Sequence, residues 1–196
     1  IFGRRPRVKS APQVLAELNA LYESGYRGRI FFVDDNFIGN RRAVRKMLPE
    51  ITAFQQERNY PFSFYTEATV DLASDTKLTE EMVQAGFGSV FLGIETPSAE
   101  SLKESGKTQN LRIDLRDAID TLTRAGLEIM GGFIVGFDND DQEIFRIQRE
   151  FISDAPIPLA MVGLLSALPG TALWRRLEKE GRLRESASGD QFGRPN

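Results

Sequence analysis

The chain repeats one pattern from end to end: a short apolar run, a stretch with helical spacing of apolar residues, then a glycine. Gly25, Gly86 and Gly126 each stand between the end of an expected helix and the start of an expected strand. Glycine is common there because it adopts positive φ without a clash from a Cβ atom. Apolar strands that alternate with amphipathic helices are typical of a parallel sheet covered by helices. The pattern therefore predicts an α/β protein of repeated strand–helix units.

The predicted elements are five strands and six helices, with a helix first. A capping-box start at Ser10 predicts a helix that Gly25 ends. The strands are expected at 29–36, 62–70, 89–95, 127–137 and 158–168, and the other helices at 41–58, 77–85, 112–125, 141–154 and around Trp174. Such repeats normally begin with a strand, so a first strand is missing. A closed eight-unit barrel needs about 250 residues, which leaves an open sheet or a partial (β/α) barrel.

The composition limits the chemistry that this chain can perform. It contains neither cysteine nor histidine, which excludes a thiolate nucleophile, a cysteine-bound metal and an imidazole base. The net charge of −3 argues against general nucleic-acid binding. No apolar run approaches the roughly 18 residues of a membrane span, and no signal peptide is visible. We therefore expect a soluble, cytoplasmic protein without a transmembrane segment.

Acidic residues follow the expected strands. Asp34, Asp35 and Asn36 end the first strand, and Glu67 and Glu95 lie at the ends of the next two. Ligands of parallel α/β sheets bind at these carboxyl ends, where acids can hold hydroxyls, ammonium groups or Mg²⁺. Asp34, Asp35 and Asn36 are also typical of a turn and helix cap. Glu67 stands among apolar residues, where an unpaired charge is costly, so it indicates function or a buried pair.

Two further features of the fourth strand bear on binding. Gly131, Gly132 and Gly136 interrupt it, which predicts close approach by a ligand or another backbone, or tight packing against a helix. The acidic run 138–141 that follows suits the first turn of a helix, where acids complement the macrodipole. The glycine spacing does not fit a dinucleotide-binding fingerprint.

Seven stretches, in order along nearly the whole chain, carry a resemblance to a known family: "IFGRRPRVKS", "FFVDDNFIGN", "FYTEAT", "SVFLGIETPS", "SLKESGKTQN", "GGFIVGFDND" and "IPLAMVGLLSALPGTALWRRL". The chain resembles hopanoid-methylase-like radical S-adenosylmethionine (SAM) enzymes, a subgroup that usually carries a cobalamin-binding domain. The resemblance implies a partial barrel over residues 1–185 and a polar tail over 186–196 that begins a truncated C-terminal extension. It also places the first strand, a C-x3-C-x2-C cluster loop and a cobalamin domain before Ile1.

The resemblance implies a SAM site at the carboxyl ends of the strands. One of the acids at the end of the first strand would hold the methionyl ammonium of SAM, and Glu67 and Glu95 would lie near its ribose and methionyl groups. Lys107 would pair with the methionyl carboxylate of SAM, and the fourth and fifth strands would flank its adenine. The implied residues are Asp34, Asp35, Asn36, Glu67, Glu95, Lys107, Gly132, Ile134, Gly136 and Leu165.

The implied whole enzyme cleaves SAM reductively at a 4Fe–4S cluster and methylates an unreactive carbon of a small-molecule or lipid substrate through cobalamin. The ligands of the cluster and of cobalamin would lie outside these 196 residues, which would supply neither catalytic residues nor metal ligands and would be inactive alone. Exposed strand edges could pair two copies of the chain. Two alternatives stay open: a cation-dependent barrel lyase or hydrolase that holds Mg²⁺ with strand-end carboxylates, and a non-catalytic interaction domain.

Overall fold

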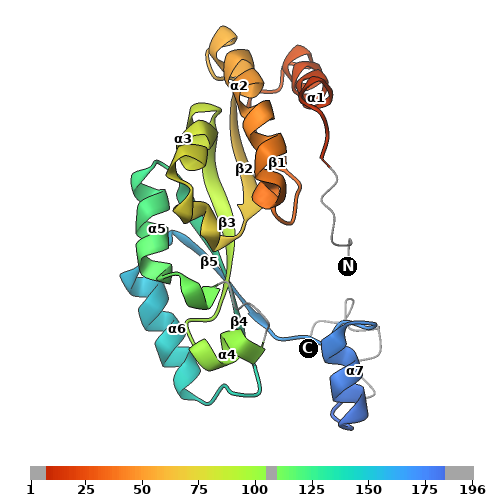
Figure 1. Ribbon diagram of the computed structural model, residues 1–196, viewed down its shortest axis with the longest axis vertical. Helices are drawn as coiled ribbons and strands as arrows, with labels where there is room; N and C mark the ends of the chain where they lie inside the picture. The colour runs from red at the N-terminus through yellow and green to blue at the C-terminus, as the bar shows by residue number, and fades with distance from the viewer. Residues whose placement is uncertain (1–7, 105–109, 184–196) are drawn as a thin grey trace. The chain divides into compact units, whose positions relative to one another are not determined.

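The computed structural model describes residues 8–104 and 110–183. The chain divides into two compact units, residues 1–163 and 164–196. The described helices and strands, in chain order (Figure 1), are α1 (Ala11–Glu23), β1 (Gly28–Phe32), α2 (Arg41–Glu57), β2 (Phe62–Ala68), α3 (Thr76–Gln84), β3 (Phe87–Glu95), α4 (Ala99–Glu104), α5 (Leu115–Arg124), β4 (Glu128–Val135), α6 (Glu143–Asp154), β5 (Leu159–Leu164) and α7 (Ala172–Lys179). Three short 3-10 helices complete them: η1 (Phe37–Asn40), η2 (Val70–Ser74) and η3 (Asn110–Arg112).

The sheet has the strand order β1-β2-β3-β4-β5, so every strand lies beside its neighbour in the sequence. The strands are parallel, and the register pairs Ile30 with Phe64 and Val90 with Ile129. Sequential parallel strands with a helical crossover between them are the arrangement of a (β/α) barrel. The predicted partial barrel is therefore confirmed.

Helices of the first unit cover one face of this sheet (Figure 1). In β2, Phe62, Phe64 and Thr66 are buried, whereas the alternate residues Ser63 and Tyr65 are exposed or half-buried. Successive strand side chains point to opposite faces, so the buried set faces the helices. The stripe of α2 that covers it includes side chains no more than 1% exposed, Val44, Leu48 and Ile51. We call the opposite face, which carries Tyr65 and Glu67, the inner face.

The three helix-ending glycines adopt the expected conformation, with φ of 84°, 98° and 104° at Gly25, Gly86 and Gly126. Several predicted boundaries were wrong. The strand predicted over 29–36 ends at Phe32, and the one predicted over 158–168 covers only β5. Helix α4 was not predicted, because six residues are too few to establish a helical period.

The described part of the second unit contains α7, which confirms the predicted helix around Trp174. Thr171 begins it, since its hydroxyl accepts a hydrogen bond from the Trp174 N–H at 3.1 Å. The polar tail predicted over 186–196 lies outside the described residues. Within the described ranges, every helix is too short or too polar to cross a membrane.

Candidate functional site

Three predicted site residues meet at the carboxyl ends of β1 and β2. Asp34 and Asp35 lie in the loop after β1, and Glu67 is the penultimate residue of β2 on the inner face. Burial raises the pKa of the Glu67 carboxyl, and the negative charges of Asp35 and then Asp34 raise it further. We call these three carboxylates at the ends of neighbouring strands the acidic rim, and their mutual repulsion favours a cationic ligand.

An aromatic and polar layer lies on the inner face below this rim. The Phe31 and Tyr65 rings stack with centroids 4.7 Å apart and planes 10° apart. The Arg29 guanidinium lies 5.1 Å from the Tyr65 centroid and donates a hydrogen bond to the Ser89 hydroxyl at 2.7 Å. Since Tyr65 stands two residues before Glu67 in the same strand, this layer forms the floor under the rim.

The strand glycines serve different contacts. A Cβ atom at Gly132 would lie 2.5 Å from the Phe91 ring on the neighbouring strand. A Cβ atom at Gly131 would lie 2.8 Å from the Phe133 side chain and 3.2 Å from that of Ile157. These neighbours belong to β4 and to the segment before β5, so Gly131 does not show the predicted packing against a helix. At Gly132 the approaching group is an aromatic side chain, which neither prediction included.

The loop after β4 is fastened to α4. Gly136, with φ of 102°, donates its N–H to Asp140 Oδ2 at 2.8 Å, and Ser101 donates its hydroxyl to Oδ1 at 2.7 Å. The acidic run was predicted to form the first turn of a helix, but α6 begins only at Glu143, whose N–H donates to Asp141 Oδ1 at 2.9 Å. The run thus fixes the loop that follows Ile134 and Gly136.

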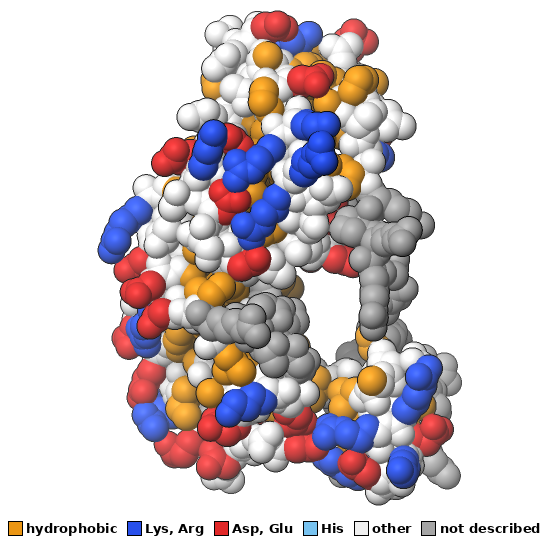
Figure 2. All heavy atoms as spheres, viewed as in Figure 1, with side chains coloured by type: hydrophobic (Ala, Val, Ile, Leu, Met, Phe, Trp, Pro, Cys, Tyr) orange, Lys and Arg blue, Asp and Glu red, His pale blue; other side chains and the backbone are white. Residues whose placement is uncertain are grey.

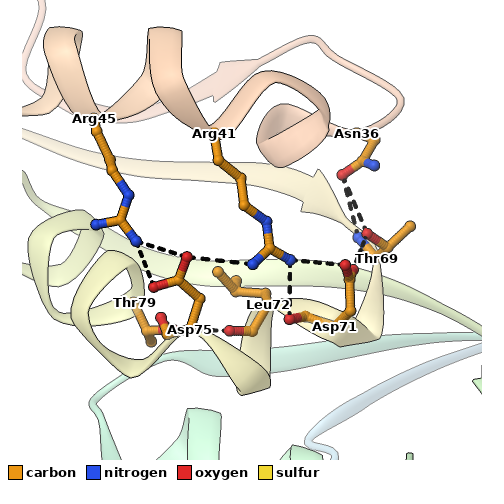
Figure 3. A network of polar contacts seen from close by, with 8 residues as sticks. All are labelled: Asn36, Arg41, Arg45, Thr69, Asp71, Leu72, Asp75 and Thr79. Carbon is orange, nitrogen blue, oxygen red and sulfur yellow. Dashed lines mark hydrogen bonds and ion pairs between the residues drawn. The ribbon is translucent and has the colours of Figure 1, made fainter. Parts of the chain in front are cut away.

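A network of arginines and aspartates holds the loops that carry the rim (Figure 3). Arg41 of α2 contacts Asp71 at 2.7 Å and Asp75 at 3.2 Å, and Arg45 contacts Asp75 at 2.6 Å. The hydrogen bond from Arg45 lowers the pKa of the Asp75 carboxyl. Figure 2 shows Lys and Arg side chains gathered over α2 and α3, where this network lies.

Asn36 joins the same network from the loop after β1. Its side-chain oxygen accepts hydrogen bonds from the Thr69 N–H at 3.4 Å and hydroxyl at 3.5 Å, and Thr69 also donates to Asp71. The loop after β1 is thereby tied to the segment that follows Glu67. Sequence reasoning missed the network because it joins residues about 30 positions apart, which no local spacing reveals.

Glu95 ends β3 in an unusual backbone conformation. Its φ is 68°, a backbone angle that residues other than glycine rarely adopt. The Thr96 N–H donates to the Ile94 carbonyl at 2.9 Å, and the pairing with β4 shifts register between Gly93 and Glu95. An i to i+2 hydrogen bond around a residue of positive φ defines a rare, strained γ-turn. Such strain is typical of functional sites.

Two predicted site residues are not placed relative to the rim. Lys107 lies outside the described residues, and Leu165 belongs to the second unit. Over the described ranges, no group of three or more carboxylates could hold a metal ion. The donor set therefore gives no support to the Mg²⁺ alternative.

Comparisons with known proteins show which proteins this chain is similar to. No protein-family model matches the chain. It is 48% identical over 190 residues to an uncharacterized methyltransferase of Synechocystis, covering 97% of this chain and 35% of the relative. It is 39% identical over 183 residues to hopanoid C-2 methylase of Rhodopseudomonas palustris, covering 93% of this chain and again 35% of the relative. The chain thus spans about a third of the length of these relatives.

A solved structure shares the fold. The radical SAM methyltransferase TsrM from Kitasatospora setae, with cobalamin and a 4Fe–4S cluster bound, aligns over 88% of this chain and 34% of that one, with a TM-score of 0.71 and 16% identity. The chain is therefore similar in sequence to these methyltransferases and shares the fold of part of TsrM. It is a homologue of hopanoid C-2 methylase, and the resemblance to hopanoid-methylase-like radical SAM enzymes is confirmed.

Proposed function

We propose that this chain is the SAM-binding barrel segment of a radical SAM methyltransferase. The observation that supports this best is the acidic rim of Asp34, Asp35 and Glu67 at the strand ends of a barrel homologous to hopanoid C-2 methylase. Ligands of such sheets bind at the carboxyl ends of the strands, so the rim lies where a SAM molecule would be expected. The substrate of the whole enzyme would be a small molecule or a lipid.

The rim fits the charge of the methionyl end of SAM. A raised pKa at Glu67 reflects burial and two neighbouring negative charges, and an ammonium group placed among the three carboxylates relieves that repulsion. Binding of the SAM ammonium group is therefore expected to lower the pKa of Glu67 again. Asn36 ties the two loops together, and Glu95 offers a carboxylate to the ribose hydroxyls.

The remaining proposed contacts belong to adenine and to the methionyl carboxylate. Gly132, Ile134 and Gly136 of β4 and its loop would lie beside adenine, with backbone near Leu165 at its edge. The Gln148 amide donates to the Ile134 carbonyl at 2.7 Å, which fixes this strand end. Lys107 would pair with the methionyl carboxylate.

The cluster and cobalamin are proposed to be held by other parts of the whole enzyme, since this chain contains no cysteine. The cluster supplies the electron that cleaves SAM, and cobalamin supplies the methyl group for transfer to carbon. The residues of this chain would bind and orient SAM, and the Phe31–Tyr65 layer would exclude water from beneath it.

The test is SAM affinity in the full-length enzyme, measured by calorimetry. Replacing Glu67 with Gln keeps the size of the side chain and removes its charge, and we expect affinity to fall about tenfold. The matched control is Glu143→Gln on the exposed face of α6, which should leave affinity unchanged. Equal affinity of the Glu67→Gln variant and the wild-type enzyme would contradict the proposal.

A further inference from the structure

Asn110 is a buried polar residue that no prediction assigned to the site. It begins η3 with only 3% of its surface exposed. Its side-chain amide donates hydrogen bonds to two consecutive carbonyls of β3, those of Gly93 at 3.2 Å and Ile94 at 3.3 Å. A buried amide has a strong requirement for such partners, because a buried polar group without them is costly.

These two carbonyls belong to the residues that lead into the γ-turn of Glu95. The Ile94 carbonyl accepts both from Asn110 and from the Thr96 N–H that closes the turn. The register shift between β3 and β4 falls at the same place, so the sheet ladder alone does not hold this backbone. A positive φ at a glutamate persists only where surrounding contacts enforce it.

We propose that Asn110 is a positioning residue for Glu95: its amide holds the Gly93 and Ile94 carbonyls and so fixes the turn that sets where the Glu95 carboxylate lies. This inference rests on the proposed role of Glu95 in SAM binding. Without the amide, the backbone relaxes toward an ordinary extended strand end. Glu95 then leaves its position at the end of β3 and binds SAM less well.

The first measurement is hydrogen exchange of the Thr96 amide in the full-length protein. Asn110→Ala should speed this exchange about tenfold, because the Thr96 N–H is protected only while the turn is closed. The matched control is Gln55→Ala. Gln55 is also fully buried and donates its amide to a strand carbonyl, that of Phe62 at 2.7 Å, but at the amino end of β2. It should leave Thr96 exchange unchanged.

The second measurement is SAM affinity across a double-mutant cycle. Asn110→Ala and Glu95→Gln should each lower affinity about tenfold, and the double variant should be no weaker than Glu95→Gln alone. If Asn110→Ala folds poorly, Asn110→Ser keeps one donor and should give intermediate exchange and affinity. Both results would support the assignment.

Three outcomes distinguish the failures. Unchanged Thr96 exchange in both Asn110 variants overturns the proposal. An equal loss of affinity on the Glu95→Gln background also overturns it, because Asn110 would then act by another route. Faster exchange with full SAM affinity in both single variants overturns the SAM role of Glu95 instead, while the hold of Asn110 on the turn stands.

Discussion

At the scale of single residues, Glu67 links the site to pH. Its folded pKa is raised by burial and then by Asp35 and Asp34, so it lies above the value in the unfolded chain. The neutral Glu67 carboxyl then stabilises the fold fully below the unfolded pKa of about 4.3. This stabilisation is lost as pH rises through the folded pKa. We expect Glu67→Gln, which cannot ionise, to gain stability relative to wild type as pH rises above the unfolded pKa, until Glu67 of the folded wild type is fully ionised. Urea unfolding over this range checks it.

The contributions of Asp35 and Asp34 to the raised pKa of Glu67 can be separated by removing one charge at a time. Asp35→Asn should lower the pKa of Glu67, followed by NMR titration of its carboxyl carbon, more than Asp34→Asn does. The order follows from the larger contribution of Asp35. A difference in stability between Glu67→Gln and wild type that does not vary with pH would contradict this account.

The positive φ at Glu95 leads to a second prediction for a single residue. Glycine normally destabilises a strand relative to alanine, but the φ of 68° at this position penalises any side chain with a Cβ atom. Glu95→Gly should therefore be more stable than Glu95→Ala by about 1 kcal/mol. Both variants lack the carboxylate, so the comparison isolates the backbone. An Ala variant as stable as the Gly variant would exclude strain at this residue.

At the scale of elements, the network between α2 and the loop after β2 is expected to stabilise the outer layer. Asp75 receives hydrogen bonds from Arg45 and Arg41, and its Oδ1 also accepts from the Leu78 N–H at 3.2 Å to cap α3. Asp75→Ala removes all three contacts and should cost about 2 kcal/mol in denaturant unfolding. Part of that loss should vanish at low pH, because the lowered pKa of Asp75 means that its stabilising charge disappears as pH falls.

Asp71 is the matched control for this prediction. It also pairs with Arg41, but its side chain is 44% exposed against 16% for Asp75, and an exposed ion pair contributes about 0.5 kcal/mol. Asp71→Ala should therefore cost much less than Asp75→Ala. Equal losses would mean that the helix cap and the second arginine contribute nothing.

The elements were predictable where local pattern decides them. Apolar runs and the three helix-ending glycines predicted the strands, their parallel order and the partial barrel. The acidic strand ends predicted Asp34, Asp35 and Glu67 as site residues, and the charges of the two aspartates act on Glu67. The γ-turn at Glu95 and the contact of the Asn110 amide could not be predicted from the sequence. A bulge and a contact across 16 residues leave no periodic pattern of apolar residues.

At the scale of the whole molecule, the two ends of the sheet differ. Beside β1, a cavity of about 310 Å³ separates the strand from α1, with Val14, Leu18 and Ile30 in its lining. At the other end, β5 exposes apolar side chains: Leu159 by 48%, Met161 by 58% and Val162 by 55%. An exposed apolar strand at a sheet edge is a template for pairing with another chain.

We therefore expect this 196-residue chain to self-associate through β5. Met161→Lys and Val162→Lys should shift it toward monomer in analytical ultracentrifugation, because a charge on an edge strand is costly to bury between sheets. Phe145→Lys is the control: Phe145 is 63% exposed but lies on α6 and not on a strand. If all three variants reduce association equally, general apolar adhesion is responsible. A loss confined to the β5 variants assigns the contact to the open edge of the sheet.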